Sequence, residues 1–199
     1  MKPSNRVVAP KFVERKQLTF SQSFTTPSTG YDIYAVPGPT PGTASNERIG
    51  RAIKQLNFDM AIQIYINSGG TPNAVVRVIY GIWKNPFLTP LDAIYILDGV
   101  AGNDGDVLLP YNPDFSDSMV IKGDHLLNLR TPTATGAAGV VAVPANNHAF
   151  RWKGTNNRVQ NFAGTSATDQ SDWQPFVLIM NSGGANINGS FKYTQYYTE

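Results

Sequence analysis

The sequence predicts an all-β fold, a jelly roll or similar sandwich of two antiparallel sheets, and three features of the 199 residues support this. Apolar residues almost nowhere recur at helical spacing. Glycine (18 residues) and proline (14 residues) interrupt the chain every few positions. The runs between them are rich in Val, Ile, Tyr, Phe and Thr, which strands favour. Many strands without helices between them pack as two sheets around one core, and no internal repeat is visible.

Strand patterns recur along the whole chain. The clearest is FDMAIQIYI at residues 58–66, where every second residue is apolar, so one face is predicted to be buried. Residues 74–83 are apolar on both faces, which predicts a strand that is covered on both sides. Gly123 interrupts another pattern and predicts a bulge. The expected strands are residues 15–26, 30–36, 49–66, 74–83, 119–129, 148–153, 157–163, 175–181 and 189–198.

One short helix is expected, at residues 89–96. Thr89 can cap it, Pro90 suits the first helical position, and Asp92 falls in the first turn. The remaining connections are rich in Gly, Pro, Asn and Thr, which predicts turns and polar loops. These connections are residues 37–46, 67–70, 98–118, 131–147 and 181–184.

The composition restricts the class of protein. Charged residues make up 15% of the chain, against about 25% in a typical globular domain. This deficit fits either extensive contact with other chains, whose core is depleted in charge, or a neutral polar surface. The absence of cysteine excludes disulfides, thiolate metal sites and a Cys nucleophile. No apolar run reaches the ~20 residues of a membrane helix, and no signal peptide is visible, so no membrane partner is expected.

The positive charges are concentrated at the start of the chain. Residues 1–16 form a basic arm ahead of the domain at 17–199, and Glu14 alone opposes its charge. Such an arm either contacts a polyanion, by neutralising phosphates and releasing counterions, or serves as a solvated tail. Its positive residues are Lys2, Arg6, Lys11, Arg15 and Lys16.

The residues of common catalytic sites are not found in productive spacing. His125 and His148 stand in neither HxH nor HExxH spacing, so no zinc site is predicted. Asp124 and His125 are neighbours on a strand and should point to opposite faces. Neither a nucleophile elbow nor a phosphate-binding loop is present. We therefore expect no enzyme and no cofactor; a glycosidase would need two carboxylates roughly 5–10 Å apart across a cleft.

The loop at residues 98–106 is the best metal candidate. Asp98, Asn103, Asp104 and Asp106 offer oxygen ligands of the kind that Ca²⁺ takes. The loop lacks EF-hand spacing, and the same residues build ordinary turns, so the turn is favoured and no metal is predicted. Aromatic residues make up 11% of the chain. Together with this acidic loop they suggest an alternative function, a jelly-roll carbohydrate-binding module, calcium-dependent or not.

Aromatic and basic residues alternate in HAFRWK (148–153) and FKYTQYYT (191–198). Exposed rings beside Arg and Lys can stack on nucleic-acid bases. The favoured interpretation is simpler: alternate residues lie on opposite sides of a strand, and one side packs in the core.

Short motifs give the chain a family resemblance. They are Arg48-Ile49-Gly50-Arg51-Ala52-Ile53, then Val75-Val76-Arg77-Val78-Ile79, then TPLDAIYIL at 89–97. In this order they resemble the capsid proteins of circular, Rep-encoding single-stranded DNA viruses and the coat proteins of satellite tobacco necrosis virus type. The resemblance extends loosely from about residue 14 to 199.

The resemblance implies a single jelly roll whose sheets use strands B-I-D-G and C-H-E-F. It also implies a viral capsid protein that assembles with itself into a small icosahedral shell, as a homo-oligomer. The packaged partner would be nucleic acid, with single-stranded DNA favoured, and the protein would be found in the virion and in the host nucleus.

By this resemblance the arm with Lys2, Arg6, Lys11, Arg15 and Lys16 lies inside the shell, near nucleic acid. Each nucleotide brings about one negative charge, so five positive charges per subunit neutralise little of a genome. Either packaging is weakly electrostatic, or the arm is longer in the complete protein, or further residues of the inner face assist. The candidates for that assistance are Arg48, Arg51 and Lys54.

Overall fold

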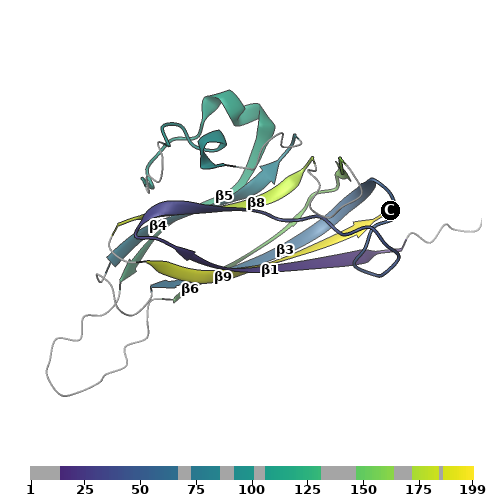
Figure 1. The fold of residues 1–199 in the computed structure, drawn as a ribbon, viewed down its shortest axis with the longest axis horizontal. Helices are drawn as coiled ribbons and strands as arrows, with labels where there is room; N and C mark the ends of the chain where they lie inside the picture. Colours follow the sequence, from purple (N-terminus) through teal and green to yellow (C-terminus); the bar gives the residue numbers. More distant parts are fainter. Residues whose placement is uncertain are drawn as a thin grey trace, which may run out of the picture.

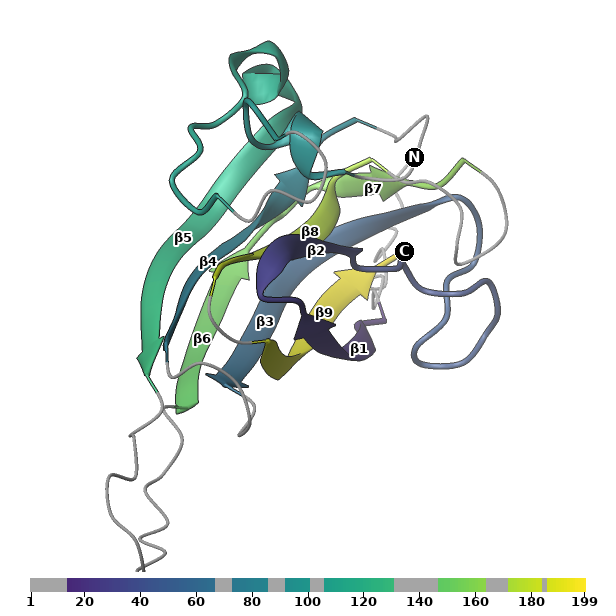
Figure 2. The same ribbon diagram turned by 60° about the vertical axis from the view of Figure 1, so that its left-hand side comes forward.

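The computed structural model describes residues 14–66, 73–85, 92–100, 106–130, 147–163, 172–183 and 186–199. Within these residues the chain is a β-sandwich of two antiparallel sheets, as predicted (Figures 1 and 2). The strands are β1 (Lys16–Thr26), β2 (Thr29–Ala35), β3 (Ala52–Ile66), β4 (Asn73–Trp83), β5 (Met119–Arg130), β6 (Asn147–Thr155), β7 (Val159–Asn161), β8 (Gln174–Ser182) and β9 (Ile187–Thr198).

The strand order is that of a jelly roll. One sheet runs β1-β9-β3-β6, and the other runs β2-β8-β4-β5. If the strands are lettered in chain order and β7 is left out, these orders are B-I-D-G and C-H-E-F. The first sheet has five strands rather than the expected four, because β7 is a separate short strand that pairs with the start of β3.

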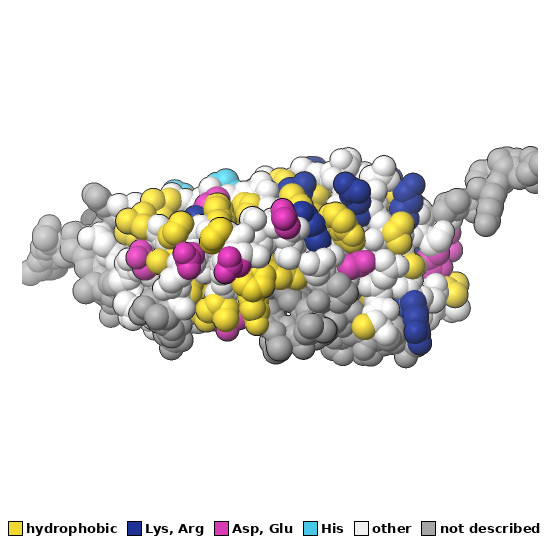
Figure 3. All heavy atoms as spheres, turned by 90° about the horizontal axis from the view of Figure 1, so that it is seen from above, with side chains coloured by type: hydrophobic (Ala, Val, Ile, Leu, Met, Phe, Trp, Pro, Cys, Tyr) yellow, Lys and Arg dark blue, Asp and Glu magenta, His cyan; other side chains and the backbone are white. Residues whose placement is uncertain are grey.

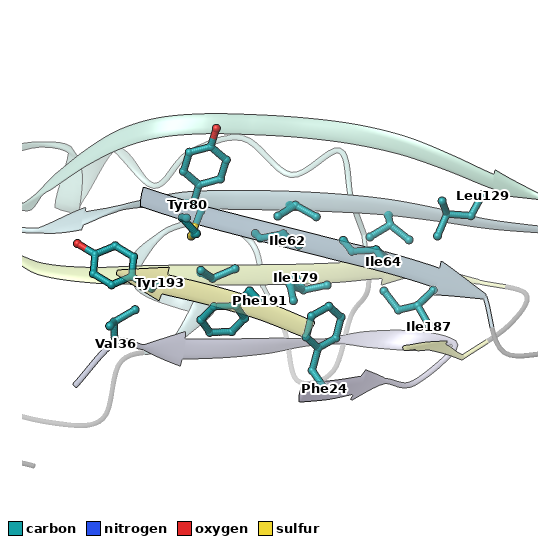
Figure 4. Packing of buried hydrophobic residues seen from close by; sticks show 14 of the residues in the cluster. Phe24, Val36, Ile62, Ile64, Tyr80, Leu129, Ile179, Ile187, Phe191 and Tyr193 are labelled. Carbon is teal, nitrogen blue, oxygen red and sulfur yellow. The ribbon is translucent and has the colours of Figure 1, made fainter. Parts of the chain in front are cut away.

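The main core lies between the two sheets. On β3, Phe58, Ile62 and Ile66 alternate with outward residues and are almost fully buried, because successive strand residues point to opposite faces. Figure 4 shows Ile62 and Ile64 of β3 and Ile179 of β8 in the space between the sheets. The strict alternation predicted for residues 58–66 is therefore confirmed.

A second apolar cluster lies on the outer face of the four-stranded sheet. There the described residues of 92–118, here called the covering segment, pack Ala93, Leu97 and Val107 against Ile79 and Leu178. Figure 2 shows this segment above β4 and β5. It explains why β4 is buried on both faces, as its sequence predicts.

The covering segment also departs from the prediction. Its helical part is a 3₁₀ turn at Ala93–Tyr95, with Asp92 at the N-cap position, while residues 86–91, including Thr89 and Pro90, lie outside the described residues. A second 3₁₀ helix, Pro113–Ser118, was not predicted; the Asn112 side chain caps it. The described parts of the expected polar loop at 98–118 thus form an ordered layer.

The remaining expectations have mixed outcomes. The pairing of β4 with β5 shifts register between Tyr80 and Gly81, next to Gly123, which confirms the bulge. The expected turn at 67–70 and nearly all of the loop at 131–147 fall outside the described residues. In the described part of the chain, no helix is long and apolar enough to cross a membrane.

Candidate nucleic-acid interface

The outer face of the five-stranded sheet, here called the sheet face, has no covering segment among the described residues. Its side chains form rows across β1, β9, β3 and β6, because residues paired between strands lie side by side. Most members are small or uncharged. From the registers, the rows are Ser23-Ser190-Gln63-Ala149, then Ser21-Lys192-Ala61-Arg151, then Thr19-Thr194-Asp59-Lys153.

Positive charge gathers in one half of the sheet face. Lys192 and Arg151 flank Ala61 in one row, and Lys153 lies in the next. Lys54 extends the group along β3, where it is exposed and paired with Thr198. Strands β3, β6 and β9 thus bring together cations that are far apart in the sequence.

Asp59 is the acidic residue within these rows. Arg151 donates to both of its carboxylate oxygens, with an Nε–Oδ1 distance of 2.7 Å, and the Lys153 ammonium lies 3.7 Å away. The hydrogen bonds from Arg151 lower the pKa of Asp59, although burial opposes this and raises it. Asp59 therefore stays ionised at neutral pH and orients two cations, while Lys192 and Lys54 form no salt bridge with any described residue.

The basic half of the face is hollowed. A hollow of about 890 Å³ is lined by Arg15, Asn57, Lys153 and Tyr196, among others, and its size falls in the ~300–1,000 Å³ range of ligand sites. The Arg15 guanidinium lies over the Tyr196 ring at 4.7 Å from its centroid. A planar cation stacked on a ring beside further cations suits contacts with phosphates and bases.

Two predicted candidates occupy other positions. Lys16 is 2% exposed, and its Nζ donates to the Glu47 carbonyl at 3.1 Å and to Glu199 at 3.2 Å. Arg48 is fully buried and donates to the Pro39 and Gly50 carbonyls. Both cations are buried and hydrogen-bonded within the fold, so neither is available to contact nucleic acid on the surface.

Arg48 instead organises the connection between β2 and β3. Its guanidinium lies 4.1 Å from the centroid of the Phe162 ring. Gly50 has a φ of +93°, which favours glycine, and Ile53 is buried with Phe162 and Tyr197. The Arg-x-Gly-x-x-Ile motif therefore has a structural role in this chain.

The other predicted residues divide by position. Arg15 and Lys54 lie on the sheet face, whereas Arg51 is exposed just before β3, at the end of the sheet. Lys2, Arg6 and Lys11 lie outside the described residues.

Sequence reasoning missed Arg151, Lys153 and Lys192 as candidates, although it selected the segments that hold them. Phe150 and Trp152 pack against the core, and Arg151 and Lys153, which alternate with them, point outwards and are exposed. The predicted alternation on β6 is thus confirmed, and it exposes the basic side chains. Their convergence with Lys192 depends on strand register, which composition does not reveal.

The Asp124–His125 pair separates as predicted. Asp124 binds Arg77 on the outer face of β5, with an Nη2–Oδ2 distance of 2.7 Å. His125 Nε2 lies 3.1 Å from the Tyr80 hydroxyl, beside the Phe150 ring.

Residues 101–105 of the candidate calcium loop lie outside the described residues. Among those described, no group of three or more His, Asp or Glu residues could hold a metal ion.

Comparison with known proteins adds no relative: the chain matches no protein-family model, and no curated protein is significantly similar to it. The proposal of a function therefore rests on the fold, the sheet face and the motifs.

Proposed function

We propose that this chain is a viral capsid protein that assembles with itself into a small icosahedral shell around a nucleic-acid genome. The observation that carries the proposal is the charge difference between the two outer faces of the jelly roll. One sheet presents a hollowed basic face, and the other is covered by an acidic segment. A subunit of a shell needs such a difference, because one of its sides meets a polyanion.

The covering segment carries charged side chains of one sign only. Residues 92–118 contain six aspartates and neither lysine nor arginine. Of these, Asp98, Asp106, Asp114 and Asp117 are exposed. A polyanion approaching this side is repelled, whereas one approaching the sheet face is attracted, so the field of the subunit orients it relative to the polymer.

The chemistry of the sheet face suits a polymer that is bound without sequence readout. Lys54, Arg151, Lys153 and Lys192 offer charge for phosphates, and the Ser, Thr, Asn and Gln side chains around them offer hydrogen bonds. Tyr196 adds a ring for stacking. This combination is typical of single-strand binding, in which phosphate contacts and stacking supply the affinity. This chemistry supports a single-stranded nucleic acid as the genome, and the family resemblance favours DNA.

The experiment is assembly of the purified chain with and without single-stranded DNA, followed by negative-stain microscopy and nuclease digestion. We expect closed particles of uniform size and nucleic acid that resists the nuclease until the particles are dissociated. A chain that stays monomeric at high concentration under every condition would contradict the proposal. Particles that never protect nucleic acid would remove the genome-binding part and leave self-assembly.

A matched pair of variants tests the face. Lys153→Glu with Lys192→Glu reverses two charges on the sheet face, and Lys84→Glu, just after β4, with Lys122→Glu, on β5, reverses two on the side of the other sheet. Only the first pair should abolish nucleic-acid protection. Equal effects of the two pairs would mean that net charge, and not the sheet face, holds the polymer.

A further inference from the structure

Exposed large hydrophobic side chains gather at two places on the described surface. They are Ile94, Leu108, Tyr111 and Leu126 at the first place, Ile49 and Val159 at the second, and Tyr65 apart from both. Scattered exposed apolar residues are ordinary, but clusters of them mark interaction sites. Four of these seven side chains fall in the first cluster, while Ile49 and Val159 lie near the same end of the five-stranded sheet.

The first cluster, here called the acidic patch, lies where the covering segment meets β5. Leu108 is 75% exposed and stands between the two carbonyls, Val107 and Leu109, that accept from Arg77. Arg77 is paired across the strands with Leu126, which is 57% exposed. Leu108 and Leu126 are thus brought to the same part of the surface.

Acidic residues lie beside the other two apolar members of this patch, Tyr111 and Ile94. The Asp98 amide donates to the Pro110 carbonyl, which places it beside Tyr111. The Asp114 amide donates to the Asn112 side chain, and that side chain also donates to the Ile94 carbonyl. In Figure 3, hydrophobic side chains stand among acidic ones over one half of this side of the molecule.

The second cluster, here called the basic patch, lies at the end of the five-stranded sheet where β3 meets β7. Val159 is 52% exposed, and its strand partner is Lys54. Ile49 is 62% exposed and precedes Arg51, whose carbonyl accepts from the Phe162 amide just after β7. Arg158 adjoins Val159 and lies over the Trp173 ring.

The basic patch carries arginines that have no acidic partner among the described residues. Arg51 and Arg158 are exposed and form no salt bridge with any described residue. Two acids at this end of the sheet have other partners: Glu199 accepts from Lys16 and from the Ile49 amide, and Asp172 accepts from the Asn161 backbone and side chain.

We propose that the acidic patch of one copy of this chain docks on the basic patch of another copy. Each patch has apolar side chains to bury and charges that need the opposite sign. Two acidic patches would repel each other, as would two basic ones, so neither forms a symmetric contact with itself. A contact between unlike patches is heterologous and repeats from copy to copy until a ring or shell closes.

This inference rests on the proposed function, because it names the contact by which the shell grows. The test is sedimentation velocity on charge-reversed full-length chains. Asp98→Lys with Asp114→Lys reverses the acidic patch, and Arg51→Glu with Arg158→Glu reverses the basic patch. Each pair should lower the assembled fraction by roughly tenfold or more, because like charges then face each other. The four substitutions together should restore assembly, because each patch then again faces the opposite charge.

A further variant guards against loss of folding. Leu108→Ser removes an exposed side chain and should weaken assembly while leaving the circular-dichroism spectrum and the melting temperature unchanged; Thr25→Ser on the sheet face is the control. Charge-reversed variants that assemble like the wild type would overturn the patch contact. A fourfold variant that fails to assemble, as each pair does, would also overturn it. Neither result would contradict the proposed shell. A wild type that never assembles would overturn both.

Discussion

Arg77 and Asp124 form a bidentate ion pair between the neighbouring strands β4 and β5, with an Nε–Oδ1 distance of 2.9 Å and an Nη2–Oδ2 distance of 2.7 Å. The third guanidinium nitrogen, Nη1, donates to the Leu109 carbonyl at 2.5 Å, and the Tyr111 hydroxyl donates to Asp124 at 2.6 Å. The pair therefore attaches the covering segment to the four-stranded sheet.

Replacing Arg77 should destabilise the fold. Arg77→Met leaves the partly exposed Asp124 carboxylate and two backbone carbonyls without their donor. We expect a loss of about 1–3 kcal/mol in the free energy of unfolding, measured by urea titration. Lys122→Met, an exposed change on the neighbouring strand β5, should alter it by less than about 0.5 kcal/mol. Equal effects of the two changes would show that the covering segment is held by its apolar contacts alone.

The same pair predicts a pH dependence. Burial raises the pKa of Asp124, but the hydrogen bonds from Arg77 and Tyr111 outweigh it and hold the pKa below its usual value. The stability that this carboxylate contributes is complete above its unfolded pKa of about 3.9 and is lost as the pH falls through the lower folded pKa.

Asp124→Asn should accordingly lower the free energy of unfolding by a constant amount between pH 7 and about pH 5, and by less as the pH falls below about 4. Urea titrations at a series of pH values measure this difference. A gap between wild type and variant that widens in acid would mean that the pKa of Asp124 is raised in the folded state.

Substituting Lys16 tests whether this residue stabilises the fold or binds nucleic acid. Its Nζ ties β1 to Glu199 at the end of the chain and to the Glu47 carbonyl. Lys16→Met should cost about 1.5–3 kcal/mol of stability, the range for hydrogen bonds to charged groups, and leave nucleic-acid affinity unchanged. Arg15→Gln, at the neighbouring position and on the sheet face, should lower nucleic-acid affinity and leave the stability unchanged. Loss of affinity in a folded Lys16→Met protein would return Lys16 to the binding set.

Lys192 should set part of the salt dependence of binding. Each phosphate that a cation neutralises on a single strand contributes about −0.7 to the slope of log K against log salt concentration. Lys192→Gln should therefore make the slope shallower by about 0.7 in fluorescence anisotropy with labelled single-stranded DNA. Lys122→Gln, on the other sheet, is the control and should leave the slope unchanged.

Much of the fold could be predicted because alternation reports burial directly. Every expected strand has a counterpart, and the period of two over Phe58 to Ile66 matches the burial of β3. The covering segment escaped prediction because its apolar residues, such as Leu97 and Val107, follow no period. What orders them is contact with Arg77 and the sheet, far away in the sequence.

The candidate site was only partly predictable. Lys16 shares the inward parity of Leu18 and Phe20, so alternation could have placed it inside the fold. Arg48 lies in a connection without a period, and no local pattern indicates its burial. Arg151 and Lys192 come together only through the pairing of both β6 and β9 with β3, which requires the register of the sheet.

Electron cryomicroscopy of particles assembled from the full chain with single-stranded DNA tests the central claim most directly, because one reconstruction reports both closure and orientation. The account predicts a closed shell in which the sheet face, with Lys54, Arg151, Lys153 and Lys192, turns inwards against nucleic-acid density. A chain that remains monomeric, or a shell in which this face points outwards, would contradict it.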